Sequence, residues 1–296
     1  MEEGRPSATA TVTALWRAAH LIWDEDPKVF QDPLALGLSG LESKAALLAA
    51  LAALQAELAR QSTPEIAQQL YGYGRAVVAL RQRYTEDALD KALERGIEQY
   101  VILGAGLDSF AYRRQDLAGV LRVFEVDHPA TQQWKRARLR ELDIPLPHNL
   151  TFVPVDFEQQ TLADGLRAGG HQSERPTFVS WLGVTVFLTE AAVFETLRYV
   201  ASLPLGSEIV FEYALPESQL DAEERHRLAV VKALAAARGE PWLSAFEPTE
   251  FAARVKELGF RQVWDLGPEE ANARYFAGRT DGLCIPHMSH IMQAQV

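Results

Sequence analysis

Short apolar runs alternate with helix-forming segments over most of the chain after residue 97. The runs indicate buried β-strands at residues 100–103, 121–126, 151–155, 177–181 and 208–213. Helix-forming segments such as 129–142 and 190–203 separate them. Strands that alternate with helices form βαβ units, so the pattern predicts an α/β fold with a mostly parallel sheet. Because the strands are almost continuously apolar, we expect helices to cover both faces of the sheet.

The last third of the chain adds further predicted strands and helices. Residues 261–266 are expected to form an edge strand, and residues 281–285 another strand. Residues 249–259 have a helical pattern. Residues 215–237 are charged and helical, which indicates a segment inserted into the α/β core.

The first 95 residues are predicted to be helical. Residues 41–60 consist almost entirely of strong helix formers, and their apolar side chains cover more than one helix face, which indicates burial. Residues 71–74, Tyr-Gly-Tyr-Gly, interrupt the helical pattern, so a separate helix is expected from about residue 75 to residue 95. These patterns divide the chain into a helical lid and substrate-pocket region (1–95), an α/β core (96–296) and a helical insert within that core (about 215–245).

The composition excludes two classes of protein. Hydrophobic residues make up 48% of the chain and charged residues 23%, a balance typical of a globular protein and not of a disordered one. The formal net charge is −11 and the pI is about 5.2. Since nucleic-acid-binding proteins need a dominant basic face, we expect no nucleic-acid partner.

Cys284 is the only cysteine, so no disulfide can form within the chain and a reducing, cytoplasmic location is expected. Its spacing to His287 and His290 resembles a metal site, but Pro286 interrupts a helix there and a fourth ligand is not apparent, so no metal is predicted. The most apolar stretch, residues 45–56, is shorter than the roughly 20 residues that cross a bilayer. We expect a protein without a membrane partner, as a monomer or homodimer.

Gly104 and Gly106 directly follow the first predicted strand. Glycine at such a turn lets the backbone bend sharply and approach a ligand closely. The dinucleotide-binding fingerprint has a third glycine, which serves close helix–strand packing, and Ser109 stands at that position here. A nicotinamide cofactor is therefore disfavoured.

Acidic residues end the next two predicted strands. Glu125 and Asp127 follow Gly106 by about 20 residues, the spacing at which a carboxylate holds the ribose hydroxyls of a bound nucleoside. Asp156 followed by Phe157 suits the amino group and ring face of adenine. Each feature alone is also typical of a turn or a helix cap. Their order on successive strand ends favours a nucleoside site at the carboxyl edge of the sheet.

Three motifs carry a resemblance to a known family: LGAGLDSFAYR (103–113), VFEVDHP (123–129) and PVDFEQQ (154–160), with weaker matches in DPLA (32–35), RQRYTEDAL (81–89) and residues 259–279. On these motifs the chain resembles the leucine carboxyl methyltransferase family, and within it the bacterial O-methyltransferases. The resemblance implies S-adenosylmethionine as the cofactor. It also implies a class I methyltransferase fold, which is a Rossmann-like, mostly parallel seven-stranded sheet with an α-helical N-terminal lid and a helical insert.

The resemblance further implies roles for individual residues. The glycine loop should line the methionine part of the cofactor, Asp127 should hold the ribose hydroxyls, and Asp156 with Phe157 should frame the adenine. An arginine on the helix before the glycine loop should pair with the cofactor's carboxylate, because a guanidinium fork binds a carboxylate at two points. Arg81 is the first choice and Arg83 the second. The complete predicted cofactor-binding set is Arg81, Arg83, Gly104, Ala105, Gly106, Asp108, Glu125, Asp127, His128, Asp156, Phe157 and Ser180.

Two positions depart from the family pattern. Leucine carboxyl methyltransferases carry a glutamate after the serine of the fourth strand, whereas Ser180 is followed here by Trp181. Phe187 stands where tyrosine is frequent. Contacts made by a glutamate after Ser180 or by a tyrosine hydroxyl at position 187 are therefore not expected in this chain.

Methyl transfer requires an acceptor placed in line with the sulfonium–methyl bond and shielded from water. A carboxylate acceptor is already ionised at neutral pH, whereas a hydroxyl acceptor usually needs a general base. His128 is the candidate base, and orienting the turn before Pro129 is its alternative role. No base stands out, which favours a carboxylate or an acidic phenol or enol.

The leading interpretation is an S-adenosylmethionine-dependent O-methyltransferase that modifies a carboxylate or hydroxyl of a small molecule, such as a polyketide or other secondary metabolite. The alternatives are a protein C-terminal carboxyl methyltransferase, a non-catalytic S-adenosylmethionine-binding protein and a nicotinamide oxidoreductase. The missing glutamate after Ser180 weakens the first alternative, and Ser109 weakens the last.

Overall fold

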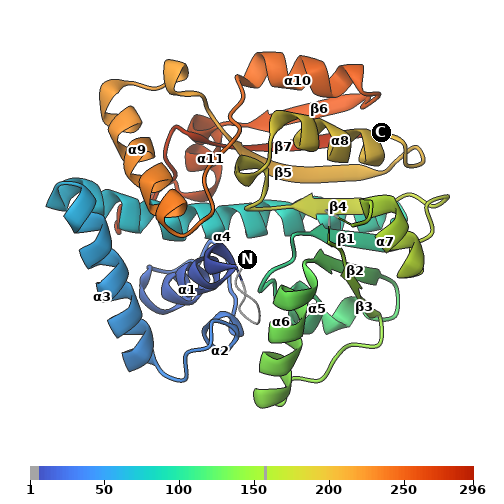
Figure 1. Cartoon of the computed structure of the whole chain (residues 1–296), viewed down its shortest axis with the longest axis horizontal. Coiled ribbons are helices and arrows are strands. Elements are labelled where there is room, and N and C mark those ends of the chain that lie inside the picture. The colour runs from blue at the N-terminus through green and yellow to red at the C-terminus, as the bar shows by residue number, and fades with distance from the viewer. Residues whose placement is uncertain (1–6, 157–158) are drawn as a thin grey trace.

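Seven strands form one sheet within residues 7–156 and 159–296, the part of the chain that the computed structural model describes. They are β1 (Gln99–Leu103), β2 (Arg122–Asp127), β3 (Leu150–Pro154), β4 (Phe178–Trp181), β5 (Glu208–Ala214), β6 (Gln262–Leu266) and β7 (Ser289–Gln295). The sheet crosses the molecule in the order β3-β2-β1-β4-β5-β7-β6 (Figure 1). Strands β1 to β5 pair in parallel, and β7 is antiparallel to both of its neighbours. The predicted class I methyltransferase fold is confirmed in this architecture.

The prediction of a strand at residues 281–285 is wrong. Leu283 and Ile285 are buried in the core as irregular chain. The side chain of Asn272 accepts a hydrogen bond from the Ile285 backbone N–H and donates one to its carbonyl. Because these buried backbone groups are satisfied in this way, the segment needs no strand partner. The seventh strand follows as β7, between β5 and the edge strand β6.

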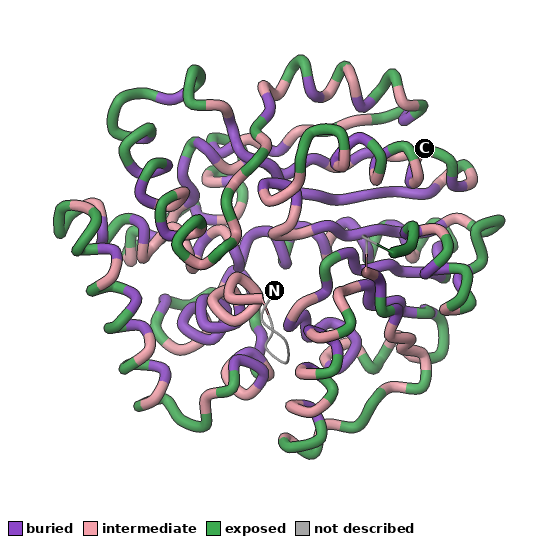
Figure 2. Tube along the Cα trace, in the orientation of Figure 1, coloured by how far each residue is buried: buried purple, intermediate pink, exposed green. Residues whose placement is uncertain are grey.

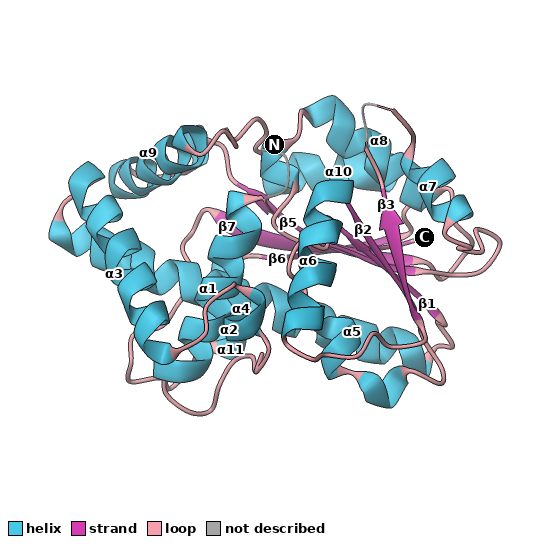
Figure 3. Ribbon diagram, turned by 60° about the horizontal axis from the view of Figure 1, so that its bottom comes forward, coloured by secondary structure: helices cyan, strands magenta, loops and turns pink. Residues whose placement is uncertain are grey.

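Helices cover both faces of the sheet, as the apolar strands predict (Figure 3). Those in the second part of the chain are α5 (Phe110–Arg113), α6 (Pro129–Glu141), α7 (Leu162–Ala168), α8 (Glu190–Ala201), α9 (Ala222–Ala237), α10 (Pro248–Glu257) and α11 (Pro268–Tyr275), with 3₁₀ turns η1 (Gln115–Leu117), η2 (Thr185–Phe187) and η3 (Glu217–Gln219). Helices α7, α8 and α10 pack on one face with Val101 and Leu103, and α5 and α11 pack on the other with Tyr100 and Ile102. The central strands are buried on both sides (Figure 2). Within the described residues, none of these helices is long and apolar enough to cross a membrane.

The described part of the N-terminal region, from residue 7, contains four helices: α1 (Ala8–Trp23), α2 (Ala35–Leu38), α3 (Lys44–Gln61) and α4 (Pro64–Glu94). The break expected at residues 71–74 is wrong, because α4 continues through them. Gly74 lies under the indole of Trp16 on α1, and a Cβ added to Gly74 would be 2.6 Å from Trp16 Cε2. The glycine is therefore a contact point between two helices and not a helix end.

The helical insert joins the N-terminal helices on the left of Figure 1. Leu58 of α3 and Leu70 of α4 form one apolar cluster with Val230 and Leu234 of α9. Arg238, just after α9, pairs with Glu57 of α3, with 2.8 Å between Nη2 and Oε2. The second half of α4 packs on the same sheet face as α5. Because α4 belongs to both layers, the division of the chain at residue 95 stays a prediction.

Gly74→Ala tests the close approach of α1 and α4. On an open helix surface alanine is the more stable residue by roughly 0.5–1 kcal/mol. Here the new Cβ would meet the Trp16 ring, so we expect the free energy of unfolding in urea to fall by about 1–3 kcal/mol.

Gly72→Ala is the matched control in the same helix. Nothing lies within 4 Å of a Cβ added to Gly72. This variant should gain about 0.4–1 kcal/mol, because alanine restricts the unfolded chain. Equal changes at the two positions would contradict the packing of Trp16 on Gly74.

Candidate functional site

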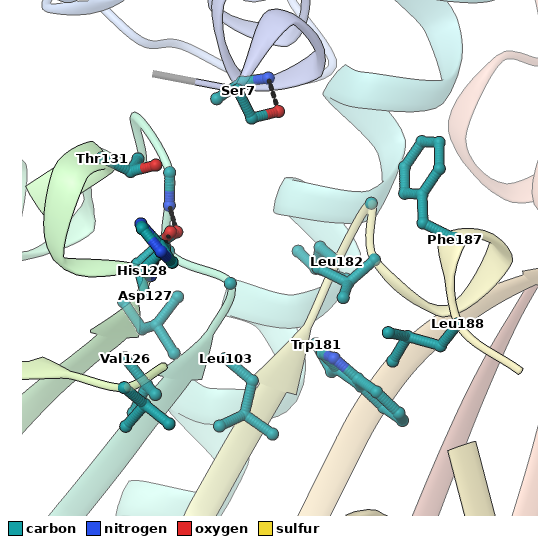
Figure 4. A pocket seen from close by; sticks show the side chains of 18 of the residues that line it. Ser7, Leu103, Val126, Asp127, His128, Thr131, Trp181, Leu182, Phe187 and Leu188 are labelled. Atoms are coloured by element: carbon teal, nitrogen blue, oxygen red, sulfur yellow. Dashed lines mark hydrogen bonds between the residues drawn. The ribbon is translucent and has the colours of Figure 1, made fainter. Parts of the chain in front are cut away.

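A cavity of about 1180 Å³ lies at the carboxyl ends of β1, β2 and β4. The loop after β1, the end of β2 and the segment from β4 to η2 form its floor and sides. The first turns of α1 and the loop at residues 239–243 cover it. Figure 4 shows Asp127, His128 and Thr131 on one side of this cavity, with Phe187 and Leu188 on the opposite side.

The glycine loop requires glycine at both of its predicted positions. Gly104 has φ +64° and Gly106 has φ +47°, a region that side-chain-bearing residues rarely adopt. A Cβ on Gly104 would be 2.4 Å from Val184 Cγ2, and one on Gly106 would be 3.2 Å from the Cβ of Ala10. The loop therefore lies directly beneath α1, and its bare backbone faces the cavity.

Asp127 holds the glycine loop against the end of β2. Its Oδ2 accepts a hydrogen bond from the Gly106 N–H at 2.6 Å, and its Oδ1 accepts one from the His128 N–H at 2.7 Å. Burial raises the pKa of the Asp127 carboxyl above its ordinary value, while these two hydrogen bonds oppose that shift. The carboxylate lines the cavity where the sequence places a ribose ligand.

His128 caps helix α6. Its Nδ1 accepts a hydrogen bond from the Ala130 N–H at 3.2 Å. In the neutral tautomer that fits this bond, the ring proton is on Nε2. The ring therefore presents a donor and not a proton acceptor, which favours its alternative role in orienting the turn over its role as a general base.

Arg81 lines the cavity, and Arg83 does not. Arg81 is buried on α4, where its Nη1 is 2.7 Å from Glu212 Oε1 and its guanidinium lies against Gly183. Its Nε has no hydrogen-bond partner among the described residues. Arg83 is half-exposed and pairs with Asp87, with 2.8 Å between Nε and Oδ1. The structure thus brings the first-choice arginine to the site and leaves the second at the surface.

Asp108 and Ser180 also line the cavity, together with Ala105. Asp108 accepts hydrogen bonds from the Phe110 N–H at 2.7 Å and from the Gln82 side chain at 3.1 Å. Ser180 Oγ is 2.8 Å from the hydroxyl of Tyr100. These bonds fix Asp108 to the start of α5 and to α4, and Ser180 to β1.

The adenine end of the predicted site is only partly described. Asp156 lines the cavity just beyond β3, and its Oδ2 accepts a hydrogen bond from Gln159 Nε2 at 2.7 Å. Phe157, the predicted adenine-stacking residue, lies outside the described residues.

The prediction that Glu125 contacts the cofactor is not supported by its position. Glu125 is fully buried in the middle of β2, does not line the cavity, and pairs with Lys135 of α6 at 2.7 Å. Burial raises the pKa of the Glu125 carboxyl to about 7, while the Lys135 ammonium opposes the shift. The pair ties the strand that carries Asp127 to the helix that follows it.

Several residues of the site were missed by sequence reasoning. Glu212 orients Arg81, and Ala10 covers Gly106. Glu212 is a carboxylate inside the apolar run of β5, and this position could have indicated its role. No sequence signal marks Ala10. Within residues 7–156 and 159–296 no three His, Cys, Asp or Glu side chains are arranged so that they could hold a metal ion, Cys284, His287 and His290 included.

The family model of leucine carboxyl methyltransferases matches residues 10–201. The chain belongs to the leucine carboxyl methyltransferase family. YktD of Bacillus subtilis strain 168 is 34% identical over 99% of each chain and is assigned by its name to the S-adenosyl-L-methionine-dependent methyltransferases. A relative from Mycolicibacterium gilvum, with a name of the same kind, is 33% identical over 70% of this chain and 65% of its own. The predicted family is therefore confirmed, and the predicted cofactor is the one that these relatives' names state.

Two solved structures share the fold of this leucine carboxyl methyltransferase family member. A DUF574 family protein of Streptomyces avermitilis covers 99% of the chain and 98% of its own, with a TM-score of 0.56 and 18% identity. A protein of Thermobifida fusca described as a methyltransferase covers 99% of the chain and 96% of its own, with a TM-score of 0.54 and 15% identity. At such identities the likeness shows the fold alone.

Trp181 follows Ser180 at the position where the family resemblance leads us to expect a glutamate, and it makes an apolar contact. Trp181 is buried and packs near Phe211 of β5, with 6.3 Å between the ring centroids. The position therefore contributes apolar surface to the sheet and to one side of the cavity.

The buried pair of Glu125 and Lys135 should show strong coupling in a double-mutant cycle at pH 8. Glu125→Leu or Lys135→Met alone leaves an uncompensated buried charge, so each should lower the free energy of unfolding by about 3–5 kcal/mol. The double variant should lose less than either single one, as measured by denaturant titration. Lys135→Met should be milder at pH 5, where the buried Glu125 takes up a proton. Additive losses would contradict the pairing.

Proposed function

We propose that this protein is an S-adenosylmethionine-dependent O-methyltransferase that acts on a small molecule. The observation that carries the proposal is the cavity of about 1180 Å³ built around the glycine loop, Asp127 and Arg81. Ligand pockets commonly measure about 300–1,000 Å³, so this volume has room for the cofactor together with a small acceptor. The names of the relatives support the cofactor and the reaction class.

The residues around the glycine loop fit the cofactor. Gly104 and Gly106 leave a bare backbone cradle that a Cβ would fill. Arg81 has a buried N–H without a partner among the described residues, and this N–H is suited to the carboxylate of the methionine part. Asp127 would accept hydrogen bonds from the ribose hydroxyls, and Asp156 would accept one from the adenine amino group.

The chain's own residues bind the reactants, orient them and exclude water. When bound, the cofactor supplies an electrophilic methyl group on its sulfonium sulfur. Asp127 fixes the loop through the Gly106 N–H, and Glu212 fixes Arg81. Helix α1 covers the loop through Ala10, so the methyl group would be held away from bulk water.

The cover over the cavity supports a small acceptor over a protein C-terminus. The side chain of Glu240, in the loop after α9, accepts hydrogen bonds from the backbone N–H and the hydroxyl of Thr9 at the start of α1. These two segments meet across the cavity, whereas a protein chain terminus would need an open cleft. The cytoplasmic location expected from the lone Cys284 stays a prediction.

Titration calorimetry with S-adenosylmethionine, its demethylated product S-adenosylhomocysteine and NAD tests the proposed function. We expect the first two ligands to bind and NAD to show no binding. Asp127→Ala should weaken binding of S-adenosylmethionine at least about tenfold, since the ribose hydroxyls lose a charged acceptor. Binding of NAD alone would overturn the proposal.

A pair of arginine substitutions tests which cation anchors the cofactor. Arg81→Lys replaces the planar fork by a point charge, so S-adenosylmethionine should bind about tenfold more weakly. Arg83→Lys makes the same change two residues away on the exposed side of α4 and should leave the calorimetric Kd unchanged. The same loss in both variants, or in Arg83→Lys only, would show that the anchor is elsewhere.

A further inference from the structure

The part of the cavity that the cofactor residues leave open has an apolar wall. Phe187 and Leu188 are only half-buried there, although both are large and apolar. Leu243, from the loop after α9, is 55% exposed and also lines the cavity. Figure 4 shows Phe187 and Leu188 across the cavity from Asp127 and His128. Exposed apolar side chains that gather inside a cavity mark a surface for an apolar ligand.

Carboxylates outnumber available cations around this cavity. Glu195 and Glu240 line it in addition to the acids at the strand ends, and Asp164, which also lines it, pairs with Arg167 at 2.9 Å. Among the described residues only two arginines line it, and both are already engaged by carboxylates. Arg17 is buried, pairs with Asp32 at 2.8 Å and donates to the Leu107 carbonyl at 2.6 Å.

Arg81, the second cation, is taken by Glu212 and faces the methionine end of the proposed cofactor site. Therefore no lysine or arginine of the described residues is left to receive an anionic acceptor. An acceptor carboxylate would lie among like charges in a partly desolvated space, where repulsion is poorly screened.

Glu240 lines the cavity beside the first turn of α1. Its Oε2 accepts the two hydrogen bonds from Thr9, and among the described residues its Oε1 has no hydrogen-bond partner. Thr9 is next to Ala10, whose Cβ is 3.2 Å from the position of a Cβ on Gly106. The carboxylate thus lines the cavity close to the glycine loop, between the cofactor residues and Leu243.

We propose that the methyl acceptor is an uncharged, largely apolar molecule with a hydroxyl group, and that Glu240 selects it. Phe187, Leu188 and Leu243 would bury its apolar body. Glu240 Oε1, which has no hydrogen-bond partner among the described residues, would accept a hydrogen bond from the hydroxyl and would repel a carboxylate in the same position. It would take the hydroxyl proton as the oxygen–methyl bond forms and the sulfur–methyl bond breaks. This inference rests on the proposed function and deepens it, since it decides between the two acceptor classes that the sequence leaves open. A protonated amine is a poorer candidate, because its nitrogen has no lone pair to receive a methyl group.

Three probes with the same apolar body test the proposal: 2-naphthol, 2-naphthoate and 2-naphthylmethylammonium. Each is titrated calorimetrically into the full chain saturated with S-adenosylhomocysteine. We expect 2-naphthol to bind at least about tenfold more tightly than 2-naphthoate or the ammonium. Equal or tighter binding of either charged probe, or no binding of 2-naphthol, would overturn the inference. The proposed function is judged separately, by whether S-adenosylhomocysteine itself binds.

Glu240→Gln isolates the charge, because its amide oxygen can still accept the hydrogen bonds from Thr9. The preference for 2-naphthol over 2-naphthoate should fall to about threefold or less in this variant. Glu174→Gln is the matched control, since Glu174 is exposed in the loop before β4 and does not line the cavity. It should keep the full preference. An unchanged preference in Glu240→Gln would overturn the role of Glu240.

A second variant tests the apolar wall, and its result does not depend on whether the contacts of Glu240 survive a substitution. Leu243→Lys adds a cation at an exposed position of the cavity wall, where a change of side chain disturbs little packing. It should weaken 2-naphthol and tighten 2-naphthoate, reversing their order of affinity. If 2-naphthol remains the tighter ligand by the same factor, Leu243 is not part of the acceptor surface and the proposed wall is wrong.

Discussion

The hydrogen bond from the Gly106 N–H to the Asp127 carboxylate is the contact on which the site depends. It joins the loop after β1 to the end of β2, so that two neighbouring strands present one continuous backbone surface. Gly106 has a positive φ, and any side chain there would meet Ala10 of α1. The bond thus holds the glycine loop and the acid together directly beneath α1.

Two ion pairs support this arrangement. One is buried away from the cavity, and the other has its arginine at the cavity. Glu125 and Lys135 are sealed under the loop and hold α6 against β2. Arg81 lines the cavity and pairs with Glu212, and its Nε has no hydrogen-bond partner among the described residues. Neither side chain of the first pair lines the cavity, whereas Arg81 does. This difference favours a structural role for Glu125 and keeps Arg81 as the candidate anchor.

The sequence predicted what depends on local pattern and missed what depends on distant contacts. Strand ends and the glycine loop follow from short apolar runs and turn residues, and they were found. Glu125 pairs in register with Ile102 inside the sheet, while Asp127 lies beyond the last β1–β2 pair, and this difference appears only once the strands are aligned. Gly74 looked like a helix break because its partner Trp16 belongs to another helix.

Helix α4 extends over 31 residues, about 46 Å, from the cluster with α9 to the face of the sheet. It carries Leu70 at one end of this span and Arg81 in its middle. A single continuous helix thus contacts α9, which leads into the covering loop, and also carries the arginine that lines the cavity. By thermodynamic linkage, any effect that a ligand in one half of the cavity has on affinity in the other half is equal in both directions.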